Sequence, residues 1–435
     1  MIGQIFYYSY YLNKIRILLR RSPEEIEKYQ LQKAVLLMHH AYYRVPYYRT
    51  LFDQAGITPS DIKSKFDFFK LPLTTKEKLR QLPLEARIVK GTDIRKLKNM
   101  STSGSTGIPL RIFSSEREVL KSKTLPFLNI FLENGCLLID KTLRLTHPCH
   151  VMKPYWFQRL NILPEYFVTV DTDMDEQLTR FMEIKPQAIR GYSSAIKSLA
   201  LKIKEKSSKF ISPKVIFTTA EVLSERDRKI ISSFFQAEVI DYYCCNEFGI
   251  IAWECRRHKG YHINSDNVMV EFLKDGRAAE EGEECDLVIT SLNNYIMPFI
   301  RYKIGDKGIL KKKPCGCGNN SLLLEAIRGR SDDIVVLSDG KMLSPYLLTS
   351  LFKDIPGVIE FQVIQKEQGR FDVPLVKEDT VADNLLIKTV QKQCQGLLGD
   401  AAQIRPFIVR HIPKEKSGKF KVIINEMRGV RSHLS

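Results

Sequence analysis

Three short apolar runs in the middle of the chain each lead into a polar loop. They end at Arg190, at Phe217 and near Tyr243. Helical patterns follow the first two loops, at residues 195–206 and again after Ser224, which can cap a helix. Strands that alternate with helices pair in parallel, and such sheets bind ligands beyond the carboxyl ends of their strands. We therefore expect one crevice formed by the loops at residues 191–194, 218–222 and 243–249.

The later part of the chain alternates apolar and polar positions instead. Residues 268–277 and 284–294 alternate as antiparallel strands do, with an Asp275-Gly276 turn between them. PFIRYKIGDKGIL, at residues 298–310, predicts another strand pair, interrupted at Gly305-Asp306. The last roughly hundred residues can form a small α+β domain. The expected fold is α/β: a large N-terminal domain with parallel sheets flanked by helices and a smaller β-rich part, then a small C-terminal domain.

The charge of the chain favours anionic ligands. Among 435 residues, 67 Lys and Arg oppose 50 acidic residues, a formal charge of +17. This suits nucleotides, coenzyme A or a lipid surface. Nucleic acid is not expected as a partner, because the basic residues are spread along the chain and form no zinc-finger, helix-turn-helix or RNA-recognition signature.

Cysteine usage and the N-terminal segment bear on location. Nine cysteines, an odd number, in a chain without a signal peptide indicate a reducing cytoplasm. No apolar run is long enough to cross a bilayer. Residues 1–21 combine apolar and basic side chains and could form an interfacial helix on the inner face of the membrane. Packing of this segment on its own domain is favoured.

STSGSTGIPL, at residues 101–110, gathers hydroxyl groups and glycines between two expected strands. A polar surface turn would explain it. The alternative is a loop that wraps phosphates, since glycines let backbone N–H groups approach and hydroxyls add further donors. It is not a P-loop, because no Lys follows Gly107. The stretch alone leaves both interpretations open.

Five motifs in a fixed order carry a resemblance that spans nearly the whole chain. They are STSGSTGIP, YYCCNEFG, RYKIGD, GRSDD and PKEKSGK. In this order they resemble the adenylate-forming superfamily of acyl-coenzyme A synthetases, in the branch of phenylacetate–coenzyme A ligases and coenzyme F390 synthetases, which includes relatives encoded with capsular polysaccharide genes. The resemblance implies an adenylate-forming domain at residues 1–329, a hinge at 330–332 and a small mobile domain at 333–435.

The resemblance also implies roles for single residues. Attack of a carboxylate on the α-phosphorus of ATP builds negative charge and expels pyrophosphate, so positioning and charge neutralisation do most of the work. The implied contacts are Ser103, Gly104, Ser105, Thr106 and Gly107 for the phosphates, Tyr243, Ala220 and Glu221 for adenine, Asp306 and Arg330 for the ribose, Glu247 for Mg²⁺, Lys419 for the α-phosphate, and Asp332 as hinge. Glu247, Arg330 and Lys419 are the implied catalytic residues.

Plainer interpretations stand beside these roles. Glu247 could be an acid at the start of a helix, and Tyr243 an ordinary aromatic residue at a strand end. Gly305-Asp306 could be only a hairpin turn. Lys419 could be a solvated lysine in a basic tail.

The chain also departs from the family pattern at three positions. Ile108 stands where the family often has Lys before the Pro of the loop. Cys244 and Asn246 replace the usual Gly and Thr before the Glu, which points to altered adenine and Mg²⁺ contacts.

A second candidate site is a metal centre. Cys255 and His258 have C-x-x-H spacing, and Cys315 and Cys317 have C-x-C spacing. Two such pairs on tight turns can form a tetrahedral structural Zn²⁺ site, with His262 as the reserve ligand. The alternative is four unrelated, reduced residues.

The expected function is ATP-dependent activation of a carboxylic acid as an acyl-adenylate, followed by transfer to a thiol, with coenzyme A as the expected acceptor. The partners are then a small carboxylic acid, ATP and the thiol, and a homodimer is left open. One alternative is adenylyl or acyl transfer to another acceptor in polysaccharide biosynthesis. Another is a non-catalytic assembly protein that uses its basic N-terminal helix to join a membrane-bound glycan machinery.

Overall fold

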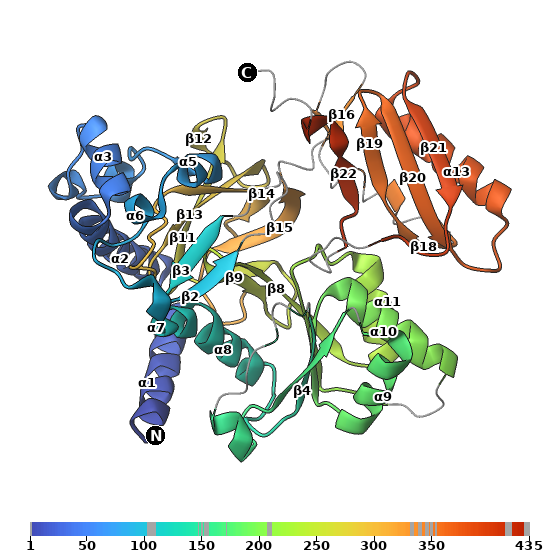
Figure 1. Ribbon diagram of the computed structural model, residues 1–435, viewed down its shortest axis with the longest axis horizontal. Coiled ribbons are helices and arrows are strands. Elements are labelled where there is room, and N and C mark those ends of the chain that lie inside the picture. Colours follow the sequence, from blue (N-terminus) through green and yellow to red (C-terminus); the bar gives the residue numbers. More distant parts are fainter. Residues whose placement is uncertain are drawn as a thin grey trace.

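A computed structural model gives the structure of the chain (Figure 1). It describes residues 2–101, 110–146, 148, 151, 156–170, 172–206, 211–330, 335–337, 342–343, 348, 351–352, 355–413 and 420–429. Two bodies are visible: a large one built on a long mixed sheet, and a smaller one at the C-terminal end. This arrangement confirms the fold class expected from the sequence.

Helices dominate the first part of the chain. The elements are α1 (Ile2–Leu19), α2 (Pro23–Arg44), α3 (Pro46–Gln54), η1 (Pro59–Asp61), α4 (Lys65–Phe68), β1 (Thr74–Thr75), α5 (Lys76–Gln81), α6 (Leu84–Arg87) and η2 (Ile94–Lys96). Ser22 begins α2 with a capping box to Glu25. Helix α1 buries Tyr11, Leu12 and Ile15 in the core of its own domain, as the sequence favoured. Within the described ranges, no helix is both long and apolar enough to span a membrane.

A hairpin and a broken helix follow. They comprise β2 (Lys98–Ser101), β3 (Arg111–Ser114), α7 (Glu116–Val119), the π-helical turn η3 (Leu120–Thr124) and α8 (Leu125–Glu133). Strands β2 and β3 pair in antiparallel register, with Met100 opposite Ile112 and Ser101 opposite Arg111. The hydroxyl-rich segment is therefore the connection of this hairpin.

Five parallel strands form one half of the main sheet. They are β4 (Thr142–Thr146), β5 (Glu165–Thr169), β6 (Ala188–Gly191), β7 (Val215–Thr219) and β8 (Glu238–Cys245), in the order β8-β7-β6-β4-β5. The elements between them are η5 (Trp156–Leu160), α9 (Met174–Ile184), α10 (Ser193–Lys206) and α11 (Glu225–Phe235). Alternate strand residues pack on opposite sides, Val215 against the α1–α8 core and Ile216 against α9–α11 (Figure 1). The parallel arrangement predicted from the alternation of strands and helices is confirmed.

The other half of the sheet is mainly antiparallel. Its strands are β9 (Gly249–Glu254), β10 (Tyr261–Ile263), β11 (Val268–Lys274), β12 (Arg277–Ala278), β13 (Glu284–Ser291), β14 (Tyr302–Lys311) and β15 (Leu323–Arg330). The Asp275-Gly276 turn joins β11 to β12, with φ of 51° and 80° at the two residues. Gly305 and Asp306 lie within β14, so the strand pair predicted for residues 298–310 is wrong, and so is the hairpin-turn interpretation. The pairing of β14 with both β13 and β15 outweighs the local turn signal.

The smaller body has a core of its own. A five-stranded sheet contains β18 (Val358–Phe361), β19 (Val363–Glu367), β20 (Arg370–Lys377), β21 (Gln403–Ile408) and β22 (Ile423–Asn425). Helix α13 (Asp383–Leu398) covers it, and β16 (Val335–Val336), β17 (Met342–Leu343) and η8 (Glu426–Gly429) complete its described elements. The domain limits at 329/330 and 332/333 stay predictions, because residues 331–334 are outside the described ranges.

Candidate active site

The loops after β6 and β7 meet at the carboxyl edge of the parallel strands. The carboxylate of Glu221 accepts hydrogen bonds from the Ser193 hydroxyl (3.0 Å) and from the Ser194 backbone N–H (2.8 Å) and hydroxyl (2.9 Å). These bonds tie the loop after β7 to the start of α10, where unpaired N–H groups favour an anion. Ala220 beside it has φ of 68°, a left-handed conformation that non-glycine residues rarely adopt. Such strain is common at functional sites.

The C-terminal body reaches the same edge. The backbone N–H of Phe420 donates a hydrogen bond of 2.7 Å to Glu221. Phe420 directly follows Lys419 in the sequence. Glu221 therefore connects two loops of the large body to the residue that directly follows the terminal lysine motif.

Tyr243 and Asp306 come together from strands far apart in the sequence. The Tyr243 hydroxyl, at the end of β8, donates a hydrogen bond to the Asp306 carboxylate in β14. Asp306 is directly opposite Arg330 in the pairing of β14 with β15. Tyr243, predicted to contact adenine, and Asp306, predicted to contact the ribose, are thus in contact. The backbone of Arg330, also predicted to contact the ribose, is adjacent to Asp306.

Glu247 is in the turn between β8 and β9 and is almost fully buried. No helix begins there, so the helix-start interpretation is wrong. Asn267 holds the turn by donating to the carbonyl oxygens of Phe248 (2.6 Å) and Ile250 (3.2 Å). Gly249 ends the turn with φ of 68°, pressed against the backbone of Ser122. The position of Glu247 is therefore fixed by packing on both sides.

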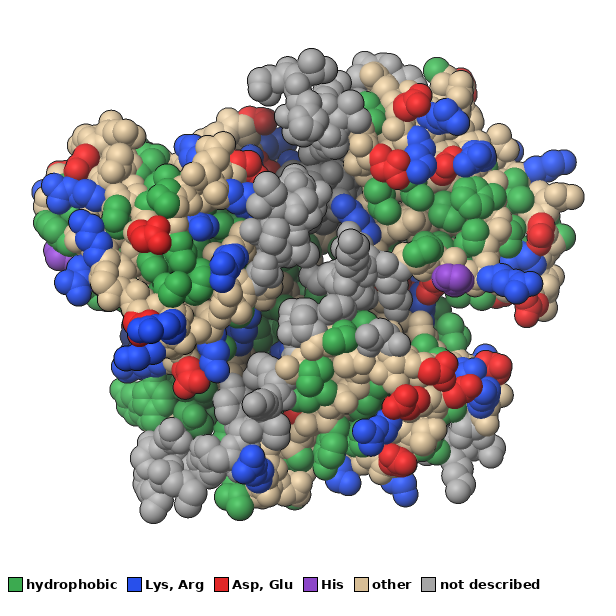
Figure 2. Space-filling model, viewed as in Figure 1, with side chains coloured by type: hydrophobic (Ala, Val, Ile, Leu, Met, Phe, Trp, Pro, Cys, Tyr) green, Lys and Arg blue, Asp and Glu red, His purple; other side chains and the backbone are tan. Residues whose placement is uncertain are grey.

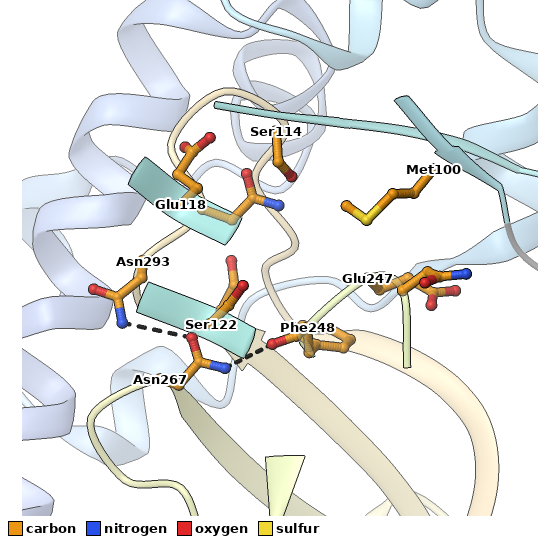
Figure 3. A pocket seen from close by; sticks show the side chains of 11 residues that line it. Met100, Ser114, Glu118, Ser122, Glu247, Phe248, Asn267 and Asn293 are labelled. Carbon is orange, nitrogen blue, oxygen red and sulfur yellow. Dashed lines mark hydrogen bonds between the residues drawn. The ribbon is translucent and has the colours of Figure 1, made fainter. Parts of the chain in front are cut away.

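A polar pocket opens beside Glu247 (Figure 3). Its lining residues are Met100, Ser114, Glu118, Ser122, Asn246, Glu247, Phe248, Asn267, Ser291, Asn293 and Asn294. The Glu118 carboxylate accepts hydrogen bonds from the backbone N–H groups of Tyr295 (2.6 Å) and Ile296 (2.9 Å), which fixes the loop after β13. Sequence reasoning missed this set, because single Ser, Asn and Glu residues from five segments carry no local signal.

Several predicted site residues cannot be placed. Ser103, Gly104, Ser105, Thr106, Gly107, Asp332 and Lys419 are outside the described residues. For Arg330 only the backbone, at the end of β15, is described. Their roles stay predictions.

The candidate metal cluster has one ligand that differs from the prediction. Ligand atoms of Cys255, His262, Cys315 and Cys317 all lie within 4.8 Å of one another. The Cys255 and Cys315 sulfurs are 3.5 Å apart, and the Cys317 sulfur is 3.3 Å from His262 Nε2. The two pairs of the sequence therefore meet, with His262 in the place predicted for His258.

His258 is turned away by acidic neighbours. Its ring nitrogens face the carboxylates of Glu238 and Glu254, and its pKa is raised, chiefly by the hydrogen bond to Glu254. The prediction of His258 as a ligand is thus not supported by the geometry. Burial lowers the pKa of His262 to about 4, so its ring is neutral, as a metal ligand must be. Among the described residues, its buried Nδ1 has no hydrogen-bond partner.

Comparisons with known proteins agree with this architecture. The CapK C-terminal domain family matches residues 335–426. A phenylacetate–coenzyme A ligase of Thermus thermophilus is 25% identical over 370 residues, which are 80% of this chain and 80% of that protein. Protein CapK of Staphylococcus aureus is 23% identical over 371 residues, 82% of this chain and 80% of that protein.

Solved structures share the fold across nearly the whole chain. A 2-hydroxyisobutyryl-CoA ligase in the postadenylation state superposes with a TM-score of 0.79 at 17% identity, covering 96% of this chain and 93% of that one. The chain therefore shares the fold of this ligase and is similar in sequence to phenylacetate–coenzyme A ligases and to CapK. The resemblance expected from the five motifs, to phenylacetate–coenzyme A ligases and to relatives encoded with capsular polysaccharide genes, is confirmed. The same ligase in the thioesterification state gives a lower TM-score of 0.62, at 19% identity, covering 96% of this chain and 94% of that one.

Replacing Gly249 should disturb the Glu247 turn. A Cβ there would lie 2.3 Å from the Ser122 carbonyl oxygen, in addition to the cost of a positive φ. Gly249→Ala should lower the free energy of unfolding by about 2–5 kcal/mol, the sum of left-handed strain and overpacking. Gly276→Ala is the matched control, since its φ is 80° but no atom lies within 4 Å, so it should cost only about 1–2 kcal/mol. Equal losses of unfolding free energy in the two variants, measured by chemical denaturation, would contradict the close packing of Gly249 against Ser122.

Proposed function

We propose that this protein activates a carboxylic acid with ATP as an acyl-adenylate and then transfers the acyl group to a thiol, coenzyme A being the expected acceptor. The observation that carries the proposal is the contact between Tyr243 and Asp306 at the edge of the sheet where Glu221 and Glu247 also lie. An aromatic face, a carboxylate for two ribose hydroxyls and an acid for a cation are the groups that bound Mg·ATP requires. Relatives named as coenzyme A ligases support the same reaction.

The chemistry divides into two steps. The carboxylate oxygen of the acid forms a bond to the α-phosphorus, and the bond from that phosphorus to the pyrophosphate oxygen breaks. The thiolate sulfur then forms a bond to the acyl carbonyl carbon, and AMP leaves with the electron pair. Mg²⁺, when bound, neutralises phosphate oxygens, and the buried Glu247 carboxylate is a suitable oxygen ligand. Asp306 would hold the ribose while Tyr243 stacks on adenine.

The contact of the two bodies supports the first step. Phe420 is held by Glu221, so the chain next to Lys419 is at the edge of the large sheet. The higher TM-score with the postadenylation state, 0.79 against 0.62 for the thioesterification state, agrees with this arrangement. A rotation about the hinge at Asp332 would remove this segment before the second step.

Replacing Lys419 should separate the two steps. Lys419→Ala should reduce acid-dependent exchange of pyrophosphate into ATP by about a hundred- to a thousandfold, the usual cost of one preorganised charge contact. Thioester formation from a chemically made acyl-adenylate should stay near the rate of the unchanged protein. Lys392→Ala, on the exposed face of α13, is the control and should alter neither rate.

Equal loss of both half-reactions would make Lys419 a general structural residue. Absence of exchange with every acid tried, in a protein that binds ATP, would contradict acid activation itself. The resemblance to relatives encoded with capsular polysaccharide genes supports a second candidate, transfer to an alcohol or amine acceptor of a glycan precursor. Mass spectrometry of the acylated product distinguishes this acceptor from a thiol.

We also propose that Cys255, His262, Cys315 and Cys317 hold a structural Zn²⁺. Three thiols and one imidazole with ligand atoms within 4.8 Å suit tetrahedral zinc. Burial is the main cause that raises the pKa of the Cys255 thiol to about 12, so binding of the metal would release a proton there. The ion would join β10 to the connection between β14 and β15, the strands that carry Asp306 and Arg330.

Metal content tests which histidine is the ligand. The purified protein should contain about one zinc per chain, as in a four-ligand structural site. His262→Ala should lose the metal and lower the unfolding temperature, whereas His258→Ala should retain it. Loss of zinc in His258→Ala but not in His262→Ala would contradict the assignment, as would a protein purified without chelators that contains no zinc.

A further inference from the structure

Lys123 is a cation in the predicted phosphate region that the mechanism above does not use. It is in the π-helical turn η3 and is mostly buried. Its ammonium group donates to the Met100 sulfur (2.9 Å) and to the Asn246 side-chain oxygen (3.3 Å). Met100 is in β2, immediately before the hydroxyl-rich loop, and Asn246 directly precedes Glu247. Lys123 thus lies between the base of that loop and the predicted Mg²⁺ ligand.

The partners of Lys123 are electrically neutral. Neither the Met100 thioether nor the Asn246 amide oxygen carries a charge, and the Glu247 carboxylate is near enough to raise the pKa of Lys123 against the effect of burial. A thioether and an amide oxygen compensate a desolvated ammonium poorly. Burial lowers the pKa of Lys123, and an anion in contact would oppose this shift. The local structure therefore has a place for an added negative charge.

The hydroxyl-rich loop has no positively charged residue of its own. Residues 101–110 contain neither Lys nor Arg, and Ile108 stands where a lysine could have been. The nearest cation in sequence, Arg111, is exposed. Arg111 is opposite Ser101 in the hairpin, and the next pair is Met100 opposite the buried Ile112. Because successive residues of a strand point to opposite faces, Arg111 lies on the face of the hairpin away from Met100 and Lys123.

Packing holds Lys123 at this place. The Lys123 side chain would be 2.9 Å from a Cβ on Gly249, so the residue is in close contact with the turn that follows Glu247. A π-helical turn inserts a residue into the helix, and such turns occur frequently at functional sites. The extra residue changes which side chains of this helix face the Glu247 turn.

We propose that Lys123 binds the β- and γ-phosphates of ATP and supplies the positive charge that the loop lacks. This inference rests on the proposed function for its ligand. The ammonium group would donate charge-assisted hydrogen bonds to oxygens of the leaving pyrophosphate, from the side opposite Arg111. It makes no bond to the α-phosphate or to the acid.

Binding of Mg·ATP and of AMP, measured by calorimetry, tests this assignment without an acid. Lys123→Met keeps an unbranched side chain, one atom shorter, and removes its charge. It should weaken Mg·ATP binding roughly tenfold to a hundredfold, the cost of one hydrogen bond to a charged group, and change AMP binding less than about twofold. Arg111→Met is the matched control and should leave both affinities unchanged. The unfolding temperature of each variant shows that it is folded.

Three outcomes would overturn the proposal. Unchanged ATP affinity in Lys123→Met would show that Lys123 does not contact the phosphates. Equal weakening of ATP binding and AMP binding would show that its role is structural. A raised KM for the acid in pyrophosphate exchange, with ATP affinity intact, assigns Lys123 to the acid carboxylate instead. Failure of exchange in the unchanged protein would refute acid activation but leave the comparison of ATP with AMP valid.

Discussion

The parallel pairing of β6, β7 and β8 is the constraint on which the candidate site depends. Because the three strands run in one direction, their carboxyl ends deliver Ser193, Glu221 and Tyr243 to one edge of the sheet. The chain reverses after β8, and this turn presents Glu247 at the same edge. The antiparallel half then brings Asp306 to the Tyr243 hydroxyl. No single loop could provide these groups at such spacing.

Charge is the second requirement of a site for ATP. The net charge of +17 is spread over the surface, where Lys and Arg are mixed with Asp and Glu on the face shown in Figure 2. The overall charge therefore does not identify the phosphate position. A single cation that packing holds in place is more informative about where phosphates would bind. Lys123 is such a cation, held between Met100 and the Glu247 turn. Glu221 adds the connection to the small body through Phe420, next to the terminal lysine motif.

Features of the fold that depend on local patterns and on the order of motifs could be predicted from the sequence. The strand ends at Arg190, Phe217 and Tyr243 are within two residues of the observed ends, since apolar runs between polar loops set them. Gly305-Asp306 looked like a turn because its dipeptide favours one, but pairing with two distant strands keeps β14 continuous. The C-x-x-H spacing suggested His258 as a metal ligand, but its ring contacts Glu238, twenty residues earlier in the sequence. Strand β10 instead brings His262 to the three cysteines. Lys123 gave no signal, because its neighbours come from segments about twenty residues before and over a hundred residues after it.

A crystal structure of the protein with bound AMP would show directly whether the edge formed by Tyr243 and Asp306 binds the nucleotide. We expect the ribose hydroxyls on the Asp306 carboxylate, adenine against the Tyr243 ring beside Ala220 and Glu221, and the phosphate directed toward Glu247. AMP bound elsewhere, or a Tyr243–Asp306 edge that stays empty at saturating AMP, would contradict this expectation.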